Sequence, residues 1–168
     1  MIEYTDKIRA LALRLLEEKK VDVVIGFQKG TLPMSNEPYM AKRPDDVKNL
    51  VWDSNCGINL TTYLTDRKEK IAVVAKGCDS RNITTHIIEN KIKRDQLVVL
   101  GVPCTGMIDR RKVNNTVDFE INDVVEQGDT IIVKGKNAET SFAKDEILQK
   151  NCAVCAHRNP VMYYELVA

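Results

Sequence analysis

The sequence predicts an α/β fold, a small parallel or mixed sheet flanked by helices, with a β-hairpin excursion near the C-terminal third. Two apolar runs, IAVVAKG (71–77) and LVVLGVP (97–103), flank a polar segment of helical character. Strands that are apolar along their whole length are typical of a covered parallel sheet, and a helix is the usual crossover between them. Because 168 residues suit one hydrophobic core, we expect a single domain over residues 1–168.

The first elements follow from periodicity and composition. Residues 5–19 carry apolar side chains at helical spacing, namely Ile8, Leu11, Ala12, Leu15 and Leu16. The β-branched run VDVVIGF (21–27) predicts a buried strand. Pro33 and Pro38 favour a loop after it, followed by short helices within RPDDVKNLVW (43–52) and INLTTYLTDRK (58–68).

The remaining elements alternate in type. We expect a helix over residues 79–94, capped by Asp79 or Ser80, and a short basic helix near MIDRRKV (107–113). The runs TVDFEI and TIIVKGK, separated by the turn EQGDT, predict a hairpin over about 116–136. A short helix over AKDEILQK (143–150) then leads to a cysteine-bearing tail over about 151–168.

Composition excludes several classes of function. The chain is 43% hydrophobic and 29% charged with a net charge of +1, and no basic patch indicates nucleic-acid binding. No apolar run approaches the roughly 20 residues that cross a bilayer, so direct membrane insertion is not expected. The N-terminal stretch is a charged amphipathic helix rather than a signal peptide. We therefore expect a cytoplasmic protein with reduced thiols.

The five cysteines are the unusual feature, because in a reduced compartment several thiols indicate metal, cluster or redox chemistry. They are Cys56, Cys78, Cys104, Cys152 and Cys155. Cys78 and Cys104 each follow a predicted strand directly. Ligands of an open parallel sheet collect beyond the carboxyl ends of its strands, which lie about 4.8 Å apart, so these two thiols are expected at one edge.

Cys152 and Cys155 form a CxxC, a spacing common in iron–sulfur sites. Zinc is the rival ligand, with His157 beside the two thiols. A thiol-based enzyme with Cys78 or Cys104 as nucleophile is a third reading, weakened because neither His86 nor His157 has an obvious base position. Five thiols exceed the four that a 4Fe-4S cluster needs, and spacing does not say which one is spare.

Basic and polar residues accompany the thiols. The turn after the strand 71–77 and the segment after Cys104 offer backbone amides and guanidinium groups, which suit a phosphate or another anionic cofactor. The candidates for cofactor binding are Lys76, Gly77, Asp79, Ser80, Arg81, Arg110 and Arg111.

The run KGCDSRNITTHIIENKIKRDQLVVLGVPCTGMIDRRK resembles the beta-subunit family of deazaflavin-coenzyme-reducing hydrogenases and formate dehydrogenases. That family places a Gly-x-Pro-Cys motif after a strand and a CxxC further on, matched here by Gly101–Cys104 and Cys152–Cys155. The similarity extends from about residue 21 onward, although only these short motifs are specific. The ferredoxin-like segment with dense CxxCxxCxxxC runs that often accompanies this domain is absent from the sequence.

The resemblance implies an electron-transfer subunit of a multi-subunit oxidoreductase, in a hydrogenase, formate dehydrogenase or heterodisulfide-reductase-type complex. Its cofactors would be a 4Fe-4S cluster and a flavin, FAD or FMN. Cys104, Cys152 and Cys155 would ligate the cluster with Cys56 or Cys78, and partner subunits would carry further iron–sulfur clusters. The alternative is a zinc-stabilised structural or binding domain of an enzyme assembly.

Overall fold

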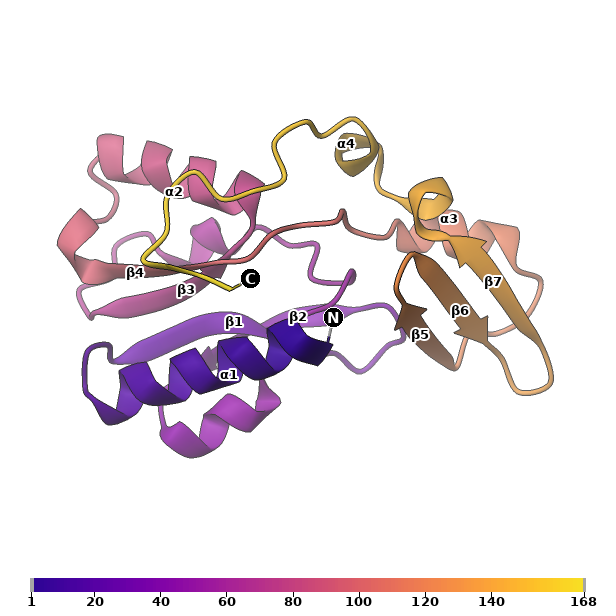
Figure 1. The fold of residues 1–168 in the computed structure, drawn as a ribbon, viewed down its shortest axis with the longest axis horizontal. Helices are drawn as coiled ribbons and strands as arrows, with labels where there is room; N and C mark the ends of the chain where they lie inside the picture. Colours follow the sequence, from indigo (N-terminus) through magenta and orange to yellow (C-terminus); the bar gives the residue numbers. More distant parts are fainter. Residues whose placement is uncertain (1, 168) are drawn as a thin grey trace.

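A computed structural model describes the backbone of residues 2–167 and the side chains of residues 3–167. A five-stranded mixed sheet has the order β2-β1-β3-β4-β8, and a separate three-stranded antiparallel sheet has the order β5-β6-β7. Figure 1 shows the second sheet, with α3 beside it, at the opposite end of the molecule from α2. The predicted fold class is confirmed.

The centre of the large sheet follows the prediction. Strands β1 (Val23–Lys29), β3 (Ile71–Ala75) and β4 (Leu97–Gly101) are parallel neighbours, and their side chains are almost all buried. Helix α1 (Ile2–Glu17) buries the predicted stripe against β1 and β3, with Ile8, Ala12 and Leu15 at most 1% exposed. Helix α2 (Gly77–Ile88) crosses over between β3 and β4.

Strand β2 (Asn36–Ala41) was not predicted, because Pro33 and Pro38 indicated a loop. It pairs antiparallel with β1 at the edge of the sheet, where a proline is tolerated since no further strand needs its missing N–H. The two short helices expected nearby are 3-10 turns, η1 (Pro44–Asn49) and η2 (Leu60–Tyr63).

The predicted bounds and cap of α2 were wrong. The helix begins at Gly77 and ends at Ile88, and Asn90 turns the chain with a φ of 57°. Lys76 is the N-cap, and Asp79 is the third helical residue, where its carboxylate accepts the Lys76 backbone N–H at 3.2 Å. An acidic side chain in the first turn was therefore mistaken for the cap itself.

The hairpin was predicted too early in the chain. Its first strand, β5, is Asp123–Gln127, whereas residues 117–122 form no strand and contribute Phe119 and Ile121 to a second apolar core. Strand β6 (Thr130–Lys134) lies where expected, and a third strand, β7 (Glu139–Ala143), completes the sheet. The expected basic helix is α3 (Arg110–Thr116).

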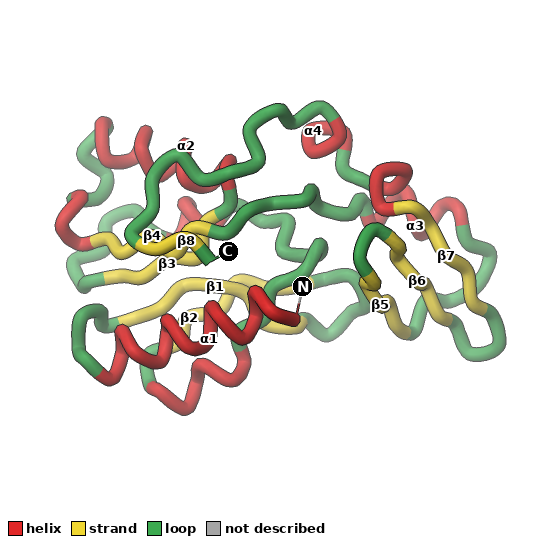
Figure 2. The backbone as a smooth tube through the Cα atoms, viewed as in Figure 1, coloured by secondary structure: helices red, strands yellow, loops and turns green. Residues whose placement is uncertain are grey.

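The chain ends in short elements. The turn η4 (Lys144–Ile147) and the helix α4 (Lys150–Ala153) replace the single helix expected over 143–150. The tail then returns across the molecule to the large sheet, where β8 (Glu165–Leu166) pairs with β4 (Figures 1 and 2). Within the described part of the chain, no helix is both long and apolar enough to span a membrane.

Candidate functional site

Two of the predicted site cysteines lie just beyond neighbouring strands. Ala75 of β3 and Gly101 of β4 are paired in register, and each strand is followed three residues later by a cysteine. Cys78 stands in the first turn of α2, and Cys104 stands in the loop that continues from β4. The expectation that the two thiols share one edge of the sheet is confirmed, because both line the same cavity.

The tail brings the CxxC to this edge. Cys104 donates its backbone N–H to the Arg158 carbonyl at 3.3 Å, and the Val161 N–H donates to Ser80 Oγ at 2.9 Å. The approach is close enough that a Cβ on Gly77 would lie 2.6 Å from the His157 carbonyl oxygen. Glycine at this position therefore allows the tail to lie on the start of α2.

Four cysteines from three separate segments surround one small cavity, which we call the thiol cavity. Its volume is about 230 Å³. Its lining residues are Gly57, Lys76, Gly77, Cys78, Arg81, Cys104, Gly106, Met107, Gln149, Asn151, Cys152, Cys155, His157 and Arg158.

Cys56 lies apart from the thiol cavity. Its side chain is fully buried, and its Sγ accepts hydrogen bonds from Asn36 Nδ2 at 3.3 Å and from the Asp53 backbone N–H at 3.5 Å. Burial, and then the Asp53 carboxylate, raises the pKa of the thiol to about 12. A thiol in this setting stays protonated and behaves as a small apolar side chain.

Burial and neighbouring charged groups shift the pKa values of two thiols in the cavity, Cys78 and Cys104. Burial raises the pKa of Cys78 to about 11 and also raises the pKa of Cys104. Cys104 adds to the shift at Cys78, and Cys152 adds to the shift at Cys104, whereas the charge of Lys76 opposes both. Free Cys78 and Cys104 are therefore protonated near neutral pH, so a metal that binds them must displace protons.

Lys76, which lines the cavity, is held in place by a buried ion pair. Its Nζ donates to Asp79 Oδ2 and to the Ile58 carbonyl, each at 2.9 Å, and lies 5.4 Å from the centre of the Phe27 ring. The side chains of Lys76 and Asp79 are 3% and 0% exposed. Burial raises the pKa of Asp79 against the opposing effect of Lys76.

The other candidates of this turn divide into two groups. Gly77 and Arg81 line the thiol cavity, where Arg81 also donates to the His157 carbonyl at 3.1 Å. Asp79 and Ser80 are buried and serve the scaffold instead, since Ser80 Oγ accepts from the tail and donates to the Gly77 carbonyl at 2.9 Å.

The four cysteine sulfurs of the thiol cavity are suitable ligands for a metal or an iron–sulfur cluster, but they are not arranged around one metal position. Among the described residues, no group of three or more His, Cys, Asp or Glu side chains is arranged to hold a metal ion. Ligation by the four cysteines thus requires their sulfur atoms to approach one another more closely. Such movement is common where metal binding is coupled to folding.

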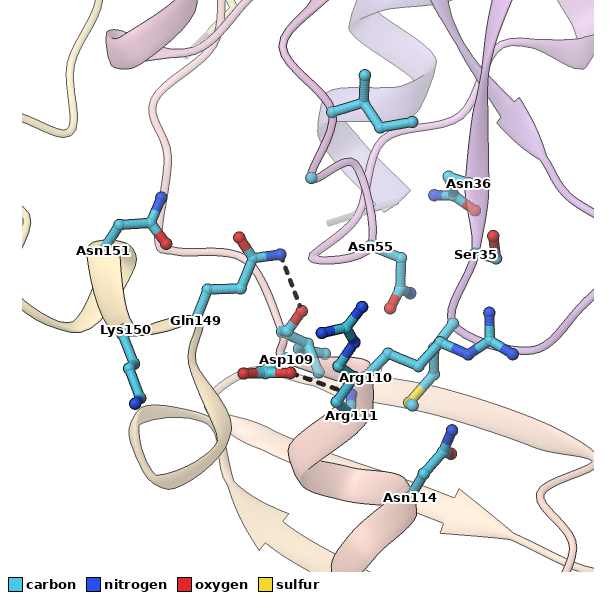
Figure 3. A pocket seen from close by; sticks show the side chains of 14 residues that line it. Ser35, Asn36, Asn55, Asp109, Arg110, Arg111, Asn114, Gln149, Lys150 and Asn151 are labelled. Atoms are coloured by element: carbon cyan, nitrogen blue, oxygen red, sulfur yellow. Dashed lines mark hydrogen bonds between the residues drawn. The ribbon is translucent and has the colours of Figure 1, made fainter.

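A second, larger cavity adjoins the first and is shown in Figure 3. Its volume is about 800 Å³, and it shares Gly57, Gln149 and Asn151 with the thiol cavity. Its other lining residues are Met34, Ser35, Asn36, Asn55, Ile58, Ile108, Asp109, Arg110, Arg111, Asn114 and Lys150. Both predicted arginines, Arg110 and Arg111, thus face this cavity rather than the thiols.

Two further features of the large cavity indicate which ligand groups it suits. Asp109 caps α3 by accepting the backbone N–H groups of Arg111 and Lys112, which fixes the start of the helix that carries both arginines. Elsewhere in the lining, Asn55 Oδ1 is buried and has no hydrogen-bond partner within the described residues. An unpaired buried oxygen is costly, so a ligand with a donor at this position would be favoured.

Sequence reasoning missed several residues of the two cavities. Gln149, Asn151 and Arg158 come to the site only because the tail folds back. A single basic or amide residue near a CxxC carries no recognisable spacing signal, so only the closeness of Arg158 to Cys155 in the sequence could have suggested that residue.

Comparison with known proteins places this geometry in context. Residues 8–50 match the family model described as coenzyme F420 hydrogenase/dehydrogenase, beta subunit N-term. The chain is 28% identical over 174 aligned residues to the F420-dependent formate dehydrogenase subunit beta of Methanocaldococcus jannaschii. That alignment covers 92% of this chain and 45% of the relative, so the chain spans less than half the length of the relative that it matches.

A solved structure shares the fold. A chain in the xenon-derivatised F420-reducing [NiFe] hydrogenase complex from Methanosarcina barkeri superposes with a TM-score of 0.68 at 16% identity, covering 93% of this chain and 62% of that one. Together, the family model, the formate dehydrogenase relative and the shared fold confirm the resemblance to the beta-subunit family of F420-dependent hydrogenases and dehydrogenases.

Proposed function

We propose that this chain is an electron-transfer component of a multi-subunit oxidoreductase and that it holds a 4Fe-4S cluster with Cys78, Cys104, Cys152 and Cys155. The observation that carries the proposal is the gathering of these four thiols, from three segments, around one cavity of about 230 Å³. Four thiolates are the usual ligand set of such a cluster. Cys56, buried and hydrogen-bonded elsewhere, is the spare thiol.

Lys76 would balance the charge of the site. Four thiolates carry negative charge into a partly buried space, where an unpaired charge is costly. The Lys76 ammonium lines the same cavity, and its charge opposes the rise that burial causes in the pKa of Cys78 and Cys104. Its ion pair with Asp79 holds it in this position.

The large cavity is proposed as the flavin site, for FAD or FMN. Its volume of about 800 Å³ is within the range of pockets that enclose cofactors. Arg110 and Arg111 would pair with flavin phosphate groups, because guanidinium forks match phosphate oxygens. A bound flavin exchanges hydride as well as single electrons. Because the two cavities share lining residues, electrons could pass directly between the two cofactors.

The wider assignment rests on the relatives. They are named as subunits or chains of F420-dependent formate dehydrogenase and hydrogenase complexes. We infer that this chain likewise works beside redox subunits that carry further iron–sulfur clusters. The net charge of +1 is not the basic excess that favours a nucleic acid partner.

Metal analysis of anaerobically purified protein tests the cluster. We expect about four iron atoms and an equal amount of acid-labile sulfide per chain, with a broad visible absorbance. His157 also lines the thiol cavity, so a zinc site with Cys152 and Cys155 is the competing outcome. Stoichiometric zinc without sulfide would establish the zinc-stabilised domain and contradict the cluster.

Flavin retention tests the large cavity separately. The double change Arg110→Ala plus Arg111→Ala should lower flavin content or affinity by at least about tenfold, because it removes charge-assisted hydrogen bonds to phosphate. Lys112→Ala is the matched control, since Lys112 stands on the same helix but does not line the cavity. Equal flavin content in both variants would remove α3 from the flavin site.

A further inference from the structure

The side chain of Arg158 joins two segments that carry the thiols. Its guanidinium donates three hydrogen bonds, all to backbone carbonyls: Nε to Cys155 at 3.4 Å, NH2 to Cys152 at 3.3 Å, and NH1 to Thr105 at 2.5 Å. The first two carbonyls belong to the CxxC turn. The third belongs to the residue that follows Cys104.

The backbone of Arg158 reinforces the same junction. Its carbonyl accepts the N–H of Cys104 at 3.3 Å, so Arg158 contacts the Cys104 loop through both its main chain and its side chain. Thr105 is in turn held from its other side, where Lys144 Nζ donates to its Oγ1 at 2.6 Å. The Cys104 loop is therefore fixed between Arg158 and Lys144.

Only arginine offers the geometry that this junction uses. A guanidinium carries five N–H donors in a rigid planar fork, so one side chain can reach three carbonyls in different directions. Lysine has the same charge but presents its donors from a single nitrogen on a flexible stem. The segment before the CxxC turn is joined to the chain after Cys104 by the bridge between Ile108 and Leu148 and by the Gln149 N–H, which donates to the Met107 carbonyl at 2.9 Å. Among the described residues, no sheet or helix hydrogen bond links the CxxC turn itself to Cys104 or Thr105, and Arg158 makes that connection.

We propose that Arg158 is a positioning residue, which sets the distance between the Cys152–Cys155 turn and Cys104. That this positioning prepares three of the four thiols to ligate a cluster rests on the proposed function. The junction itself does not, because all of its contacts are made between atoms of the chain.

Thiol cross-linking in the metal-free 168-residue chain tests the proposal directly. Dibromobimane joins two thiols only when they lie close together, and peptide mass mapping identifies the pair. We expect the wild-type chain to give the Cys104–Cys152 product. Arg158→Gln should lower its rate of formation by about tenfold or more, the scale of one lost hydrogen bond from a charged group.

Two further variants complete the design. Arg158→Lys keeps the charge and should also lose the product, because positioning depends on the fork, and it serves if Arg158→Gln does not fold. Arg94→Gln is the matched control: Arg94 NH1 donates to the Leu97 carbonyl at 2.9 Å, at the opposite end of β4, so this variant should cross-link as the wild type does. Thermal unfolding of each variant separates local displacement from loss of fold.

The proposal is overturned if folded Arg158→Gln and Arg158→Lys both form the cross-link at the wild-type rate. Iron content, measured on separate anaerobic preparations, reports on the proposed function independently. A wild-type chain without iron would refute the cluster, and the cross-linking rates would still decide the role of Arg158. Full iron in the wild type with unchanged cross-linking in the variants would refute the role of Arg158 and leave the cluster intact.

Discussion

A buried ion pair between β5 and η4 lies where the small sheet meets the Ser54 loop, and breaking it should destabilise the protein strongly. Lys144 Nζ lies 2.6 Å from Glu126 Oε1, and the two side chains are 6% and 9% exposed. The Glu126 carboxylate also accepts the Ser54 N–H at 3.1 Å and the Ser54 hydroxyl at 2.8 Å. Glu126 belongs to β5, whereas Ser54 belongs to the loop that follows β1 and β2.

The cost of each single change follows from the charge that it leaves behind. Glu126→Leu leaves the buried Lys144 ammonium without its counterion, and Lys144→Met leaves the Glu126 carboxylate without its own. Each change should lower the free energy of unfolding by about 3–5 kcal/mol. Replacing both removes the two charges together, and then the main remaining cost is the Ser54 donors that lose their acceptor, about 1–3 kcal/mol. The double variant should thus be more stable than either single variant.

Urea denaturation followed by the fluorescence of Trp52 provides the assay, since this tryptophan is 2% exposed in the main core and is the single one in the chain. The matched control is the exposed pair Lys134–Glu139 on the same small sheet, where Glu139→Gln should cost under about 1 kcal/mol. The reasoning fails if the buried single variants lose no more free energy of unfolding than this control. It also fails if the loss in the double variant equals the sum of the two single losses.

Three further predictions follow from the site. Cys56, whose pKa is raised to about 12, holds its proton in the folded state above the unfolded value of about 8.5. The stability that the protonated thiol contributes is therefore complete below pH 8.5 and is lost as pH rises toward 12. Between pH 8.5 and pH 10, the free energy of unfolding measured in urea should fall by about 2 kcal/mol less for Cys56→Ala than for the wild type. An identical pH slope in both proteins would show that Cys56 ionises freely. Gly77→Ala should displace the tail, because its Cβ would meet three backbone carbonyls at 2.6–2.9 Å, and hydrogen exchange of the Val161 amide should then rise sharply; continued protection would show that the tail accommodates the methyl group. Cys152→Ser plus Cys155→Ser should remove the iron and expose the tail to cleavage after Lys150, whereas a double variant with full iron and a protected tail would show that the CxxC is not the cluster site.

The sequence predicted the centre of the fold because local signals and topology agree there. Apolar runs before and after α2 require a right-handed crossover between neighbouring parallel strands, and this places Cys78 and Cys104 together without further information. The apolar end of the tail is consistent with its return to the sheet, because an apolar segment favours a surface that it can cover. Met162 packs against the core, while Tyr163, Tyr164 and Leu166 remain partly exposed.

What could not be predicted depends on contacts between distant segments. Arg158 acquires its role only from three carbonyls that the fold brings to it, and the Lys144–Glu126 pair joins β5 to η4 across a sheet whose first strand was misplaced. Strand β2 was missed because Pro38 is acceptable only at an edge, and no local signal tells which strand will be the edge.

The ligand assignment is the central claim, and iron content across single cysteine variants tests it most directly. Each cysteine is changed to alanine in turn, and the anaerobically prepared proteins are analysed for iron and acid-labile sulfide. We predict that Cys78→Ala, Cys104→Ala, Cys152→Ala and Cys155→Ala each lose the 4Fe-4S cluster, while Cys56→Ala keeps it at the wild-type level. A Cys56→Ala protein without iron beside a Cys78→Ala protein with full iron would contradict the assignment.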